Sequence, residues 1–227
     1  MKPARPAQGA LPFDAAGPSP DLPQGVLWLR GRLGLAEQRA VLDAVADAVA
    51  AAPFFRPVMR DGTPMVNRLT NLGPLGWVSD RQGYRYQPHH PETGAPWPAV
   101  PPGLYAQAVT AAAAAGVPGY APDACLVNAY RDDGRLGLHR DHDEADFRWP
   151  IVSFSFGAEA AFILGGPDRR GPTRTLRLVS GDVLVLAGPA RLRFHGVRRI
   201  FPGTAPFDHP LFGAGARINL TFRRAMP

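Results

Sequence analysis

The chain has 227 residues, a length that fits one domain with a substantial hydrophobic core. Its 25 Gly, 26 Pro and 45% hydrophobic residues indicate a turn-rich globular protein and exclude a coiled coil or a disordered chain. The single cysteine, Cys125, excludes an internal disulfide and a zinc site built from thiolates, which favours a reducing, cytoplasmic environment. We expect neither a signal peptide nor a membrane span, because no apolar stretch of sufficient length occurs in the sequence.

The net charge of +6 is compatible with an anionic partner such as nucleic acid. However, 24 of the 25 basic residues are Arg and only Lys2 is Lys, a composition that a GC-rich genome also produces. The charge alone therefore does not decide whether the protein binds nucleic acid.

Two helices are predicted in the first half of the chain, after a loose segment over residues 1–24 that is rich in Pro, Ala and Gly. Apolar residues at helical spacing predict the first helix over 35–52, which Pro53 ends. A run of alanines predicts the second over 103–116, with small side chains suited to close packing against a sheet.

Residues 54–98, between these helices, are rich in Gly, Pro, Arg and aromatic residues and are predicted to form a surface flap. After residue 120 the pattern changes to short apolar runs separated by turns, as in an all-β sandwich or barrel. These runs are CLVNAY, PIVSFSF, AAFIL, RTLRLV, DVLVLAG, LRFHGV and ARINLTF.

A candidate metal site is formed by His139 and Asp141, which are two residues apart, and by His195 about fifty residues later. Two imidazoles and one carboxylate form the facial triad that binds non-haem Fe(II) and leaves positions open for oxygen and a co-substrate. Alternate residues of an extended segment point the same way, so the close pair can share one ion. A surface-turn histidine and a satisfied buried histidine are the alternatives for His139 and His195. His142 is a rival ligand, but it lies on the opposite side of an extended chain.

The segment ARINLTFRR predicts a strand with Arg217, Asn219, Thr221 and Arg223 on one face. If this face is buried, its two guanidiniums need an anion, and a dicarboxylate would pair with both. The alternative is an edge strand whose polar face is in water.

The segment LVNAY likewise places Asn128 and Tyr130 on one face of a strand. An amide and a phenol there can hydrogen-bond a carboxylate in the same pocket. The alternative is an ordinary strand with a buried tyrosine that finds a partner elsewhere.

In this order and spacing, PDACLVNAY, LHRDHDE, FHGV and RINLTFRR resemble the AlkB family of Fe(II)- and 2-oxoglutarate-dependent dioxygenases. The resemblance extends upstream through LGWVSDRQGYRYQP and PWPAVP, and so covers the chain from about residue 25 onward. It implies a mainly β fold with flanking helices: a double-stranded β-helix (jelly roll) core with an N-terminal nucleotide-recognition lid. We therefore expect a flexible segment at 1–24, supporting helices and the lid at 25–120, with the lid at about 54–98, and the dioxygenase core at 121–227.

The resemblance also implies a role for individual residues. The Fe(II) ligands would be His139, Asp141 and His195. The residues that bind 2-oxoglutarate would be Arg217 and Arg223, which pair with its two carboxylates, and Asn128, Tyr130 and Asn219. The residues around the substrate would be Met65, Trp77, Arg81, Tyr84, Asp143 and Arg169. Of these, Trp77 would stack on the target base, Tyr84 would touch the nucleic-acid backbone, and Asp143 would lie near an exocyclic nitrogen.

The implied reaction consumes O2 and demethylates N-alkylated bases such as 1-methyladenine and 3-methylcytosine in single-stranded DNA, with RNA as a further target. Formaldehyde, succinate and CO2 are released, and the enzyme is expected to act as a monomer. The sequence departs from the family pattern at His142 (usually Lys), Gly137 (usually Ser) and Thr63 (usually Tyr), which bears on substrate binding more than on the chemistry. Two alternatives remain: a dioxygenase of the same type acting on tRNA, protein or a small molecule, and a non-catalytic nucleic-acid-binding β-sandwich.

Overall fold

The computed structural model describes residues 21–131, 134–212 and 216–227. Most of the predicted flexible segment, residues 1–20, therefore lies outside the described residues. The elements are β1 (Val26–Leu29), α1 (Leu35–Ala51), β2 (Arg68–Leu72), β3 (Gly76–Asp80), β4 (Gly83–Gln87), α2 (Pro102–Ala114), β5 (Ala124–Tyr130), β6 (Leu136–His139), β7 (Ile151–Gly157), β8 (Glu159–Leu164), β9 (Arg174–Leu178), β10 (Val183–Leu186), β11 (His195–Phe201) and β12 (Arg217–Arg223), with short 3-10 helices at Gly188–Ala190 and Pro210–Phe212.

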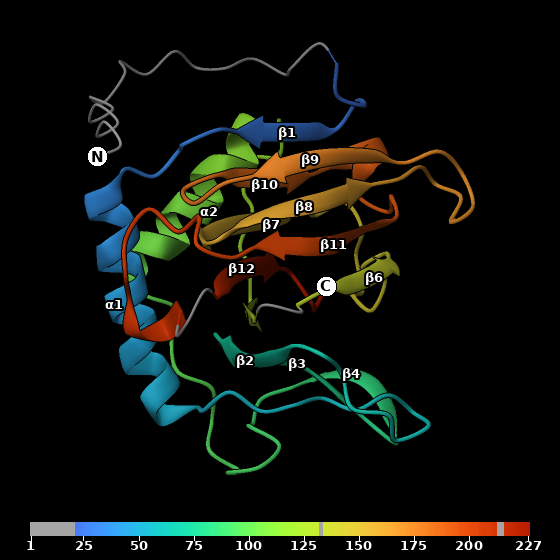
Figure 1. Cartoon of the computed structure of the whole chain (residues 1–227). Coiled ribbons are helices and arrows are strands. Elements are labelled where there is room, and N and C mark those ends of the chain that lie inside the picture. The colour runs from blue at the N-terminus through green and yellow to red at the C-terminus, as the bar shows by residue number, and fades with distance from the viewer. Residues whose placement is uncertain (1–20, 132–133, 213–215) are drawn as a thin grey trace.

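Two antiparallel sheets form the core of the molecule (Figure 1). The larger has the strand order β1-β10-β7-β12-β5-β2 and the smaller β6-β11-β8-β9. Apolar side chains from both sheets, such as Ile151 and Leu184 of the larger and Phe162 and Val197 of the smaller, form one cluster between them. The predicted mainly β, jelly-roll architecture is confirmed.

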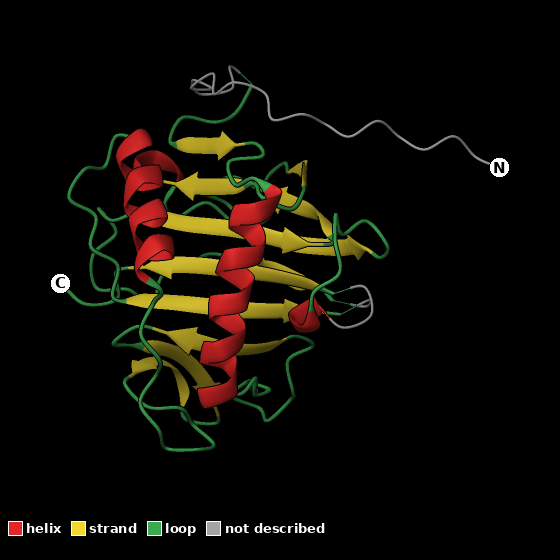
Figure 2. Cartoon of the chain, turned by 90° about the vertical axis from the view of Figure 1, so that its left-hand side faces the viewer, coloured by secondary structure: helices red, strands yellow, loops and turns green. Residues whose placement is uncertain are grey.

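Both helices lie across the other face of the larger sheet (Figure 2). Helix α1 buries Leu42 and Val45 against it, and α2 buries Ala108, Ala111 and Ala112. The alanines lack bulky side chains, so the α2 backbone can approach the strands closely. Both predicted helices are confirmed to within two residues at each end. No helix of the described residues is long and apolar enough to cross a membrane.

Strand β12 lies inside the larger sheet, where it pairs with β5 on one side and β7 on the other. Its two arginines are buried, with Arg217 only 1% and Arg223 only 7% exposed. The alternative of a solvated edge strand is therefore excluded. The buried charges of both arginines need partners that compensate them.

The predicted flap over 54–98 has two parts. Strand β2 is the sixth strand of the larger sheet, where it pairs with β5. Strands β3 and β4 instead form a separate two-stranded hairpin, at the lower right of Figure 1. Phe55, Leu69, Val78 and Trp97 pack together beneath this region. The β3–β4 hairpin is therefore the part of the flap that stands apart from the two core sheets.

The sequence pattern did not predict strands β1, β2, β3, β4 and β6, and it began β11 too early. Strands β2, β3, β4 and β6 mix Gly, polar and charged residues with apolar ones, so none of them forms a continuous apolar run. Strand β11 begins only at His195 because the residues before it bond within a turn, where the Arg193 amide donates to the Ala190 carbonyl.

Candidate metal centre and its cavity

His139, Asp141 and His195 converge at one end of the smaller sheet. His139 is the last residue of β6 and His195 the first of β11, and the two are direct cross-strand partners. The Nε2 atom of His139 lies 3.8 Å from Asp141 Oδ1, and the Nε2 atom of His195 lies 3.7 Å from Asp141 Oδ2. One ligand atom from each residue can be chosen so that all lie within 4.8 Å of one another. Strand pairing thus explains why residues far apart in sequence meet.

The hydrogen bonds of this cluster fit a divalent metal ion. The Nδ1 atom of His139 lies 2.9 Å from the Gly137 carbonyl oxygen, and that of His195 lies 3.0 Å from the Arg193 carbonyl oxygen. A carbonyl only accepts, so each Nδ1 carries the proton and each Nε2 keeps a free lone pair. Asp141 Oδ2 is buried and has no hydrogen-bond partner among the described residues. Two imidazole nitrogens and one carboxylate are thus free to bind a metal such as Fe(II).

The electrostatics favour the ligating forms. Burial, reinforced by the neighbouring His139 ring, lowers the pKa of His195 to about 4, so this imidazole is neutral at pH 7. Burial acts to raise the pKa of Asp141, but the guanidinium of Arg223 and the two histidines outweigh it and hold that pKa below its usual range. Asp141 is therefore a carboxylate. His142, the rival ligand, is exposed and does not belong to the cluster.

A cavity between the two sheets opens beside the metal cluster. Its walls include His139 and His195 from the cluster and a set of polar side chains from the larger sheet. These are Asn128, Tyr130, Ser153, Arg217, Asn219 and Thr221. The residues predicted to bind a dicarboxylate from β5 and from the first half of β12 are therefore brought together next to the candidate metal ligands.

Arg217 is a buried cation without a carboxylate partner among the described residues. It donates to Ser155 Oγ at 2.6 Å and to the Ala158 carbonyl at 3.2 Å, while its Nε has no partner among those residues. Burial lowers its pKa to about 10, which still leaves it charged at pH 7. A buried, incompletely paired guanidinium facing a cavity is suited to binding a carboxylate.

Asn219 and Tyr130 are two further polar residues of the cavity. The amide nitrogen of Asn219 donates to Ser153 Oγ and to the Phe154 carbonyl, both at 2.8 Å, and its oxygen accepts from Thr221. Tyr130 is buried, and burial raises its pKa to about 12, so its phenol keeps its proton. The side-chain amide of Asn219 is thus already hydrogen-bonded to neighbouring residues through both its nitrogen and its oxygen, and Tyr130 contributes a protonated phenol to the cavity.

Arg223 contacts the candidate metal ligand Asp141 and is not among the residues that line the cavity. Its Nη2 donates to Asp141 Oδ1 at 2.8 Å and its Nη1 to the hydroxyl of Tyr86 at 3.2 Å. The two arginines of β12 thus occupy separate positions, one in the cavity and one against a candidate metal ligand.

Three of the residues predicted to contact a substrate, Trp77, Tyr84 and Asp143, contact one another. The rings of Trp77 and Tyr84 stack with centroids 5.5 Å apart, and the indole nitrogen of Trp77 donates to Asp143 Oδ2 at 2.9 Å. The other three lie on separate loops: Met65 is half-buried before β2, Arg81 is exposed at the tip of the β3–β4 hairpin, and Arg169 is exposed between β8 and β9.

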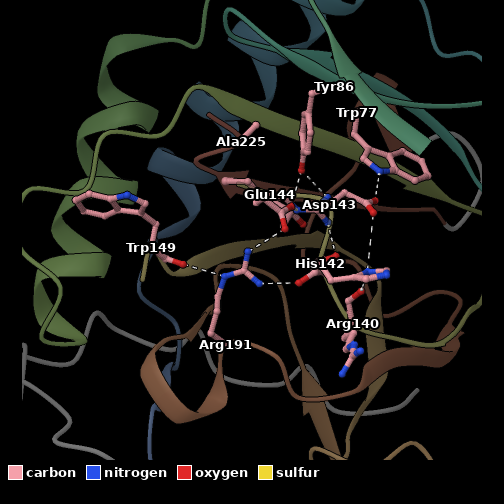
Figure 3. A network of polar contacts seen from close by, with 12 residues as sticks. Trp77, Tyr86, Arg140, His142, Asp143, Glu144, Trp149, Arg191 and Ala225 are labelled. Atoms are coloured by element: carbon pink, nitrogen blue, oxygen red, sulfur yellow. Dashed lines mark hydrogen bonds and ion pairs between the residues drawn. The ribbon is translucent and has the colours of Figure 1, made fainter. Parts of the chain in front are cut away.

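Tyr86, Glu144 and Arg191 form a buried network that the sequence did not reveal (Figure 3). The hydroxyl of Tyr86 donates to Glu144 Oε1 at 2.6 Å, and Arg191 donates to Glu144 Oε2 at 2.9 Å. In the sequence these are ordinary charged and aromatic residues of Arg-rich segments. The one available signal was that Tyr86 follows Tyr84 by two residues, which places both on one face of a strand.

Residues 25–223 match the family model described as the 2OG-Fe(II) oxygenase superfamily. Together with the jelly-roll fold and the candidate metal cluster, this match defines a dioxygenase that uses Fe(II), 2-oxoglutarate and O2.

The chain is also similar to curated proteins over most of its length. It is 51% identical over 195 residues to the "Alpha-ketoglutarate-dependent dioxygenase AlkB homolog" of Caulobacter vibrioides, covering 86% of this chain and 85% of that protein. It is 42% identical over 204 residues to "Alpha-ketoglutarate-dependent dioxygenase AlkB" of Escherichia coli, covering 90% and 92%. The chain therefore belongs to the AlkB family.

More distant relatives match as well. A partial match, 43% identical over 114 residues and covering 47% of this chain and 26% of the other, is to "DNA N(6)-methyladenine demethylase ALKBH1D" of Arabidopsis thaliana. The solved structure of OsALKBH1 superposes with a TM-score of 0.73 at 32% identity, covering 89% of this chain and 99% of that one.

Proposed function

We propose that this dioxygenase demethylates N-alkylated bases, such as 1-methyladenine and 3-methylcytosine, in single-stranded DNA and also in RNA. The observation that carries the proposal is the stacked pair of Trp77 and Tyr84, which Trp77 ties to Asp143, two residues after the candidate metal ligand Asp141. The name of the Arabidopsis thaliana relative, a DNA demethylase, supports the same substrate class.

Each step of the reaction can be assigned to residues of this chain. His139, Asp141 and His195 would hold Fe(II), which with 2-oxoglutarate and O2 supplies the oxidising power for hydroxylating the methyl carbon. Arg217 in the cavity and Arg223 beside Asp141 would each pair with one carboxylate of 2-oxoglutarate. Asn128, Tyr130 and Asn219 would line its binding site. The hydroxymethylated base then releases formaldehyde, and 2-oxoglutarate is converted to succinate and CO2.

Base selection would begin before the chemistry. Methylation of the Watson-Crick edge prevents normal pairing, so such a base costs only a few kcal/mol to unstack. A flipped base would stack on the indole of Trp77, while Tyr84 touches the backbone and Arg81, Arg169 and Met65 surround the strand. Methylation at these positions makes the base cationic, and the Asp143 carboxylate would favour that cation over a neutral base.

The proposal extends to the oligomeric state, the domain organisation and the location of the enzyme. We infer a monomer of three parts: the segment 1–24, the region 25–120 with supporting helices and the lid at about 54–98, and the dioxygenase core at 121–227. A cytoplasmic location fits a chain with one buried cysteine and no disulfide.

The test is anaerobic loading with Fe(II) and 2-oxoglutarate, followed by O2 and a single-stranded oligonucleotide that contains 1-methyladenine. Stoichiometric formaldehyde from the wild type, lost in His139→Ala, is the expected result. Succinate without formaldehyde would leave the dioxygenase in place but indicate a protein, tRNA or small-molecule substrate. Oligonucleotide binding without either product, despite bound metal, would indicate a non-catalytic binding module.

A further inference from the structure

Four charged side chains form a buried cluster that includes the candidate metal ligand Asp141. Arg191 is 2%, Glu144 4%, Asp141 7% and Arg223 7% exposed. The cluster holds two carboxylates and two guanidiniums, so its charge is balanced. Arg191 donates to Glu144 and to the backbone carbonyls of Asp141 and Trp149 at 2.8 Å each, which fixes the loop that carries Asp141 (Figure 3).

Tyr86 of strand β4 brings the β3–β4 hairpin into this cluster. Its hydroxyl donates to Glu144 Oε1 at 2.6 Å and accepts from Arg223 Nη1 at 3.2 Å. Burial, as the largest cause, raises the pKa of Tyr86, so the phenol keeps the proton that it donates. One hydroxyl therefore connects the carboxylate of Glu144 to the guanidinium of Arg223.

The hairpin is attached to the adjoining loop at two successive residues. Trp77 and Tyr86 are direct cross-strand partners, so their side chains lie on the same face of the hairpin. Trp77 donates to Asp143 and Tyr86 to Glu144, and these acceptors are neighbours just after Asp141 (Figure 3). The hydroxyl of Tyr86 that docks the hairpin on Glu144 is therefore the same group that accepts a hydrogen bond from Arg223.

Removing the hydroxyl would change where Arg223 bonds. Arg223 Nη1 would lose its acceptor, and Glu144 Oε1 would keep only the Nε atom of Arg223, 3.6 Å away. A buried carboxylate with an unmet hydrogen bond attracts the nearest guanidinium. Arg223 would then shift toward Glu144 and away from Asp141.

We propose that Tyr86 is a positioning residue that couples docking of the β3–β4 hairpin to the orientation of Arg223, and so to the binding of 2-oxoglutarate. The inference rests on the proposed function, which assigns Arg223 to the co-substrate and the hairpin to the nucleic acid. By linkage, an oligonucleotide that holds the hairpin in place tightens 2-oxoglutarate binding, and 2-oxoglutarate tightens oligonucleotide binding by the same factor.

The first test uses Tyr86→Phe and needs no nucleic acid. The dissociation constant of 2-oxoglutarate is measured by calorimetry on the full chain loaded with Mn(II), which supports no turnover. It should rise about tenfold, the effect of one hydrogen bond to a charged group. Tyr105→Phe, which removes a hydroxyl from the distant helix α2, should leave the constant unchanged. A Tyr86→Phe value within about twofold of the wild type overturns the proposal.

The second test measures the coupling. The same dissociation constant is determined with and without a saturating single-stranded oligonucleotide that contains 1-methyladenine. The wild type should bind 2-oxoglutarate about fivefold tighter or more with the oligonucleotide, and Tyr86→Phe should bind equally with and without it. A merely structural role would lower the urea midpoint of the variant but leave this ratio at the wild-type value, which overturns the proposal.

The two arms separate this proposal from the proposed function. A wild-type ratio of one, together with formaldehyde release in the activity assay, overturns the coupling and leaves the demethylase in place. If no oligonucleotide binds, the demethylase proposal fails, and the calorimetric comparison of Tyr86→Phe with Tyr105→Phe still decides whether Tyr86 positions Arg223.

Discussion

The indole nitrogen of Trp77 donates a hydrogen bond to Asp143 Oδ2, and the second oxygen of this carboxylate, Oδ1, lies near the neighbouring residue His142. That second oxygen lies 3.9 Å from His142 Nδ1. An aromatic ring suited to stacking and a carboxylate suited to a cation are thus held together as one unit, two residues beyond Asp141.

This unit leads to a test of charge selectivity. Asp143→Asn should lower kcat/KM about tenfold on cationic 1-methyladenine and 3-methylcytosine, because it removes a charge-assisted contact, and much less on neutral 3-methylthymine. Formaldehyde release from matched oligonucleotides measures both values. An equal loss on cationic and neutral bases would remove the argument that Asp143 recognises charge.

Metal binding should raise the thermal stability of the protein. Mn(II) at about one hundred times its dissociation constant should stabilise the free protein by about 2.7 kcal/mol, a rise of roughly 5–10 °C in thermal midpoint for a chain of this size. His139→Ala should abolish the shift, whereas His89→Ala, which removes an exposed histidine from a distant loop, should retain it. A shift retained in His139→Ala would mean that the ion binds elsewhere.

Arg217 is expected to bind 2-oxoglutarate and, without it, to lower the free energy of unfolding. Arg217→Met should stabilise the metal-free protein by roughly 1–3 kcal/mol, because a buried, incompletely paired guanidinium is replaced by an apolar side chain of similar length. The same variant should lose measurable binding of 2-oxoglutarate. Urea unfolding and calorimetry measure the two effects, and a variant less stable than the wild type would show that the protein itself compensates the charge of Arg217.

Three buried acidic groups should make the protein sensitive to alkali. Burial raises the pKa values of Cys125, Tyr120 and Tyr130, the last to about 12. Above about pH 9–10 the unfolded chain therefore releases protons that the folded chain keeps, and the unfolding free energy falls as the pH rises, by up to about 1.4 kcal/mol per pH unit for each group. Urea unfolding between pH 8 and pH 11 should show this decline.

Tyr120→Phe provides the matched variant for that decline. The hydroxyl of Tyr120 is buried without a hydrogen-bond partner among the described residues, so its removal should stabilise the protein at pH 7 by about 1 kcal/mol. It should also make the loss of stability above pH 10 shallower, because one titrating group is gone. Tyr105→Phe, at a half-exposed position on α2, should change neither quantity. A Tyr120→Phe variant with the wild-type slope would show that Tyr120 does not contribute to alkaline unfolding.

The sequence allowed the prediction of features that follow from local periodicity. Alternation along β12 placed Arg217 and Arg223 on one face, and the spacing of His139 and Asp141 suggested a shared ligand. The same pattern could not show that Arg223 bonds Asp141 rather than lining the cavity, because that depends on where two distant segments meet. Nor could it show that the amide of Asn219 is occupied by Ser153 and Phe154 of the neighbouring strand.

The buried network was beyond prediction for the same reason. Tyr86 and Glu144 are 58 residues apart and Arg191 lies 47 residues beyond Glu144, so no local pattern relates them. In an Arg-rich chain, a charged residue in a polar segment normally indicates a solvated surface. Only the fold shows that these three side chains are enclosed together.

Strand β12 fills the position between β5 and β7, which without it would each present an unpaired edge in the middle of the larger sheet. A chain cut before residue 217 would therefore expose two aggregation-prone edges and lose both arginines in one event. The continuity of the larger sheet and the presence of Arg217 and Arg223 beside the candidate metal centre thus depend on the same seven-residue strand.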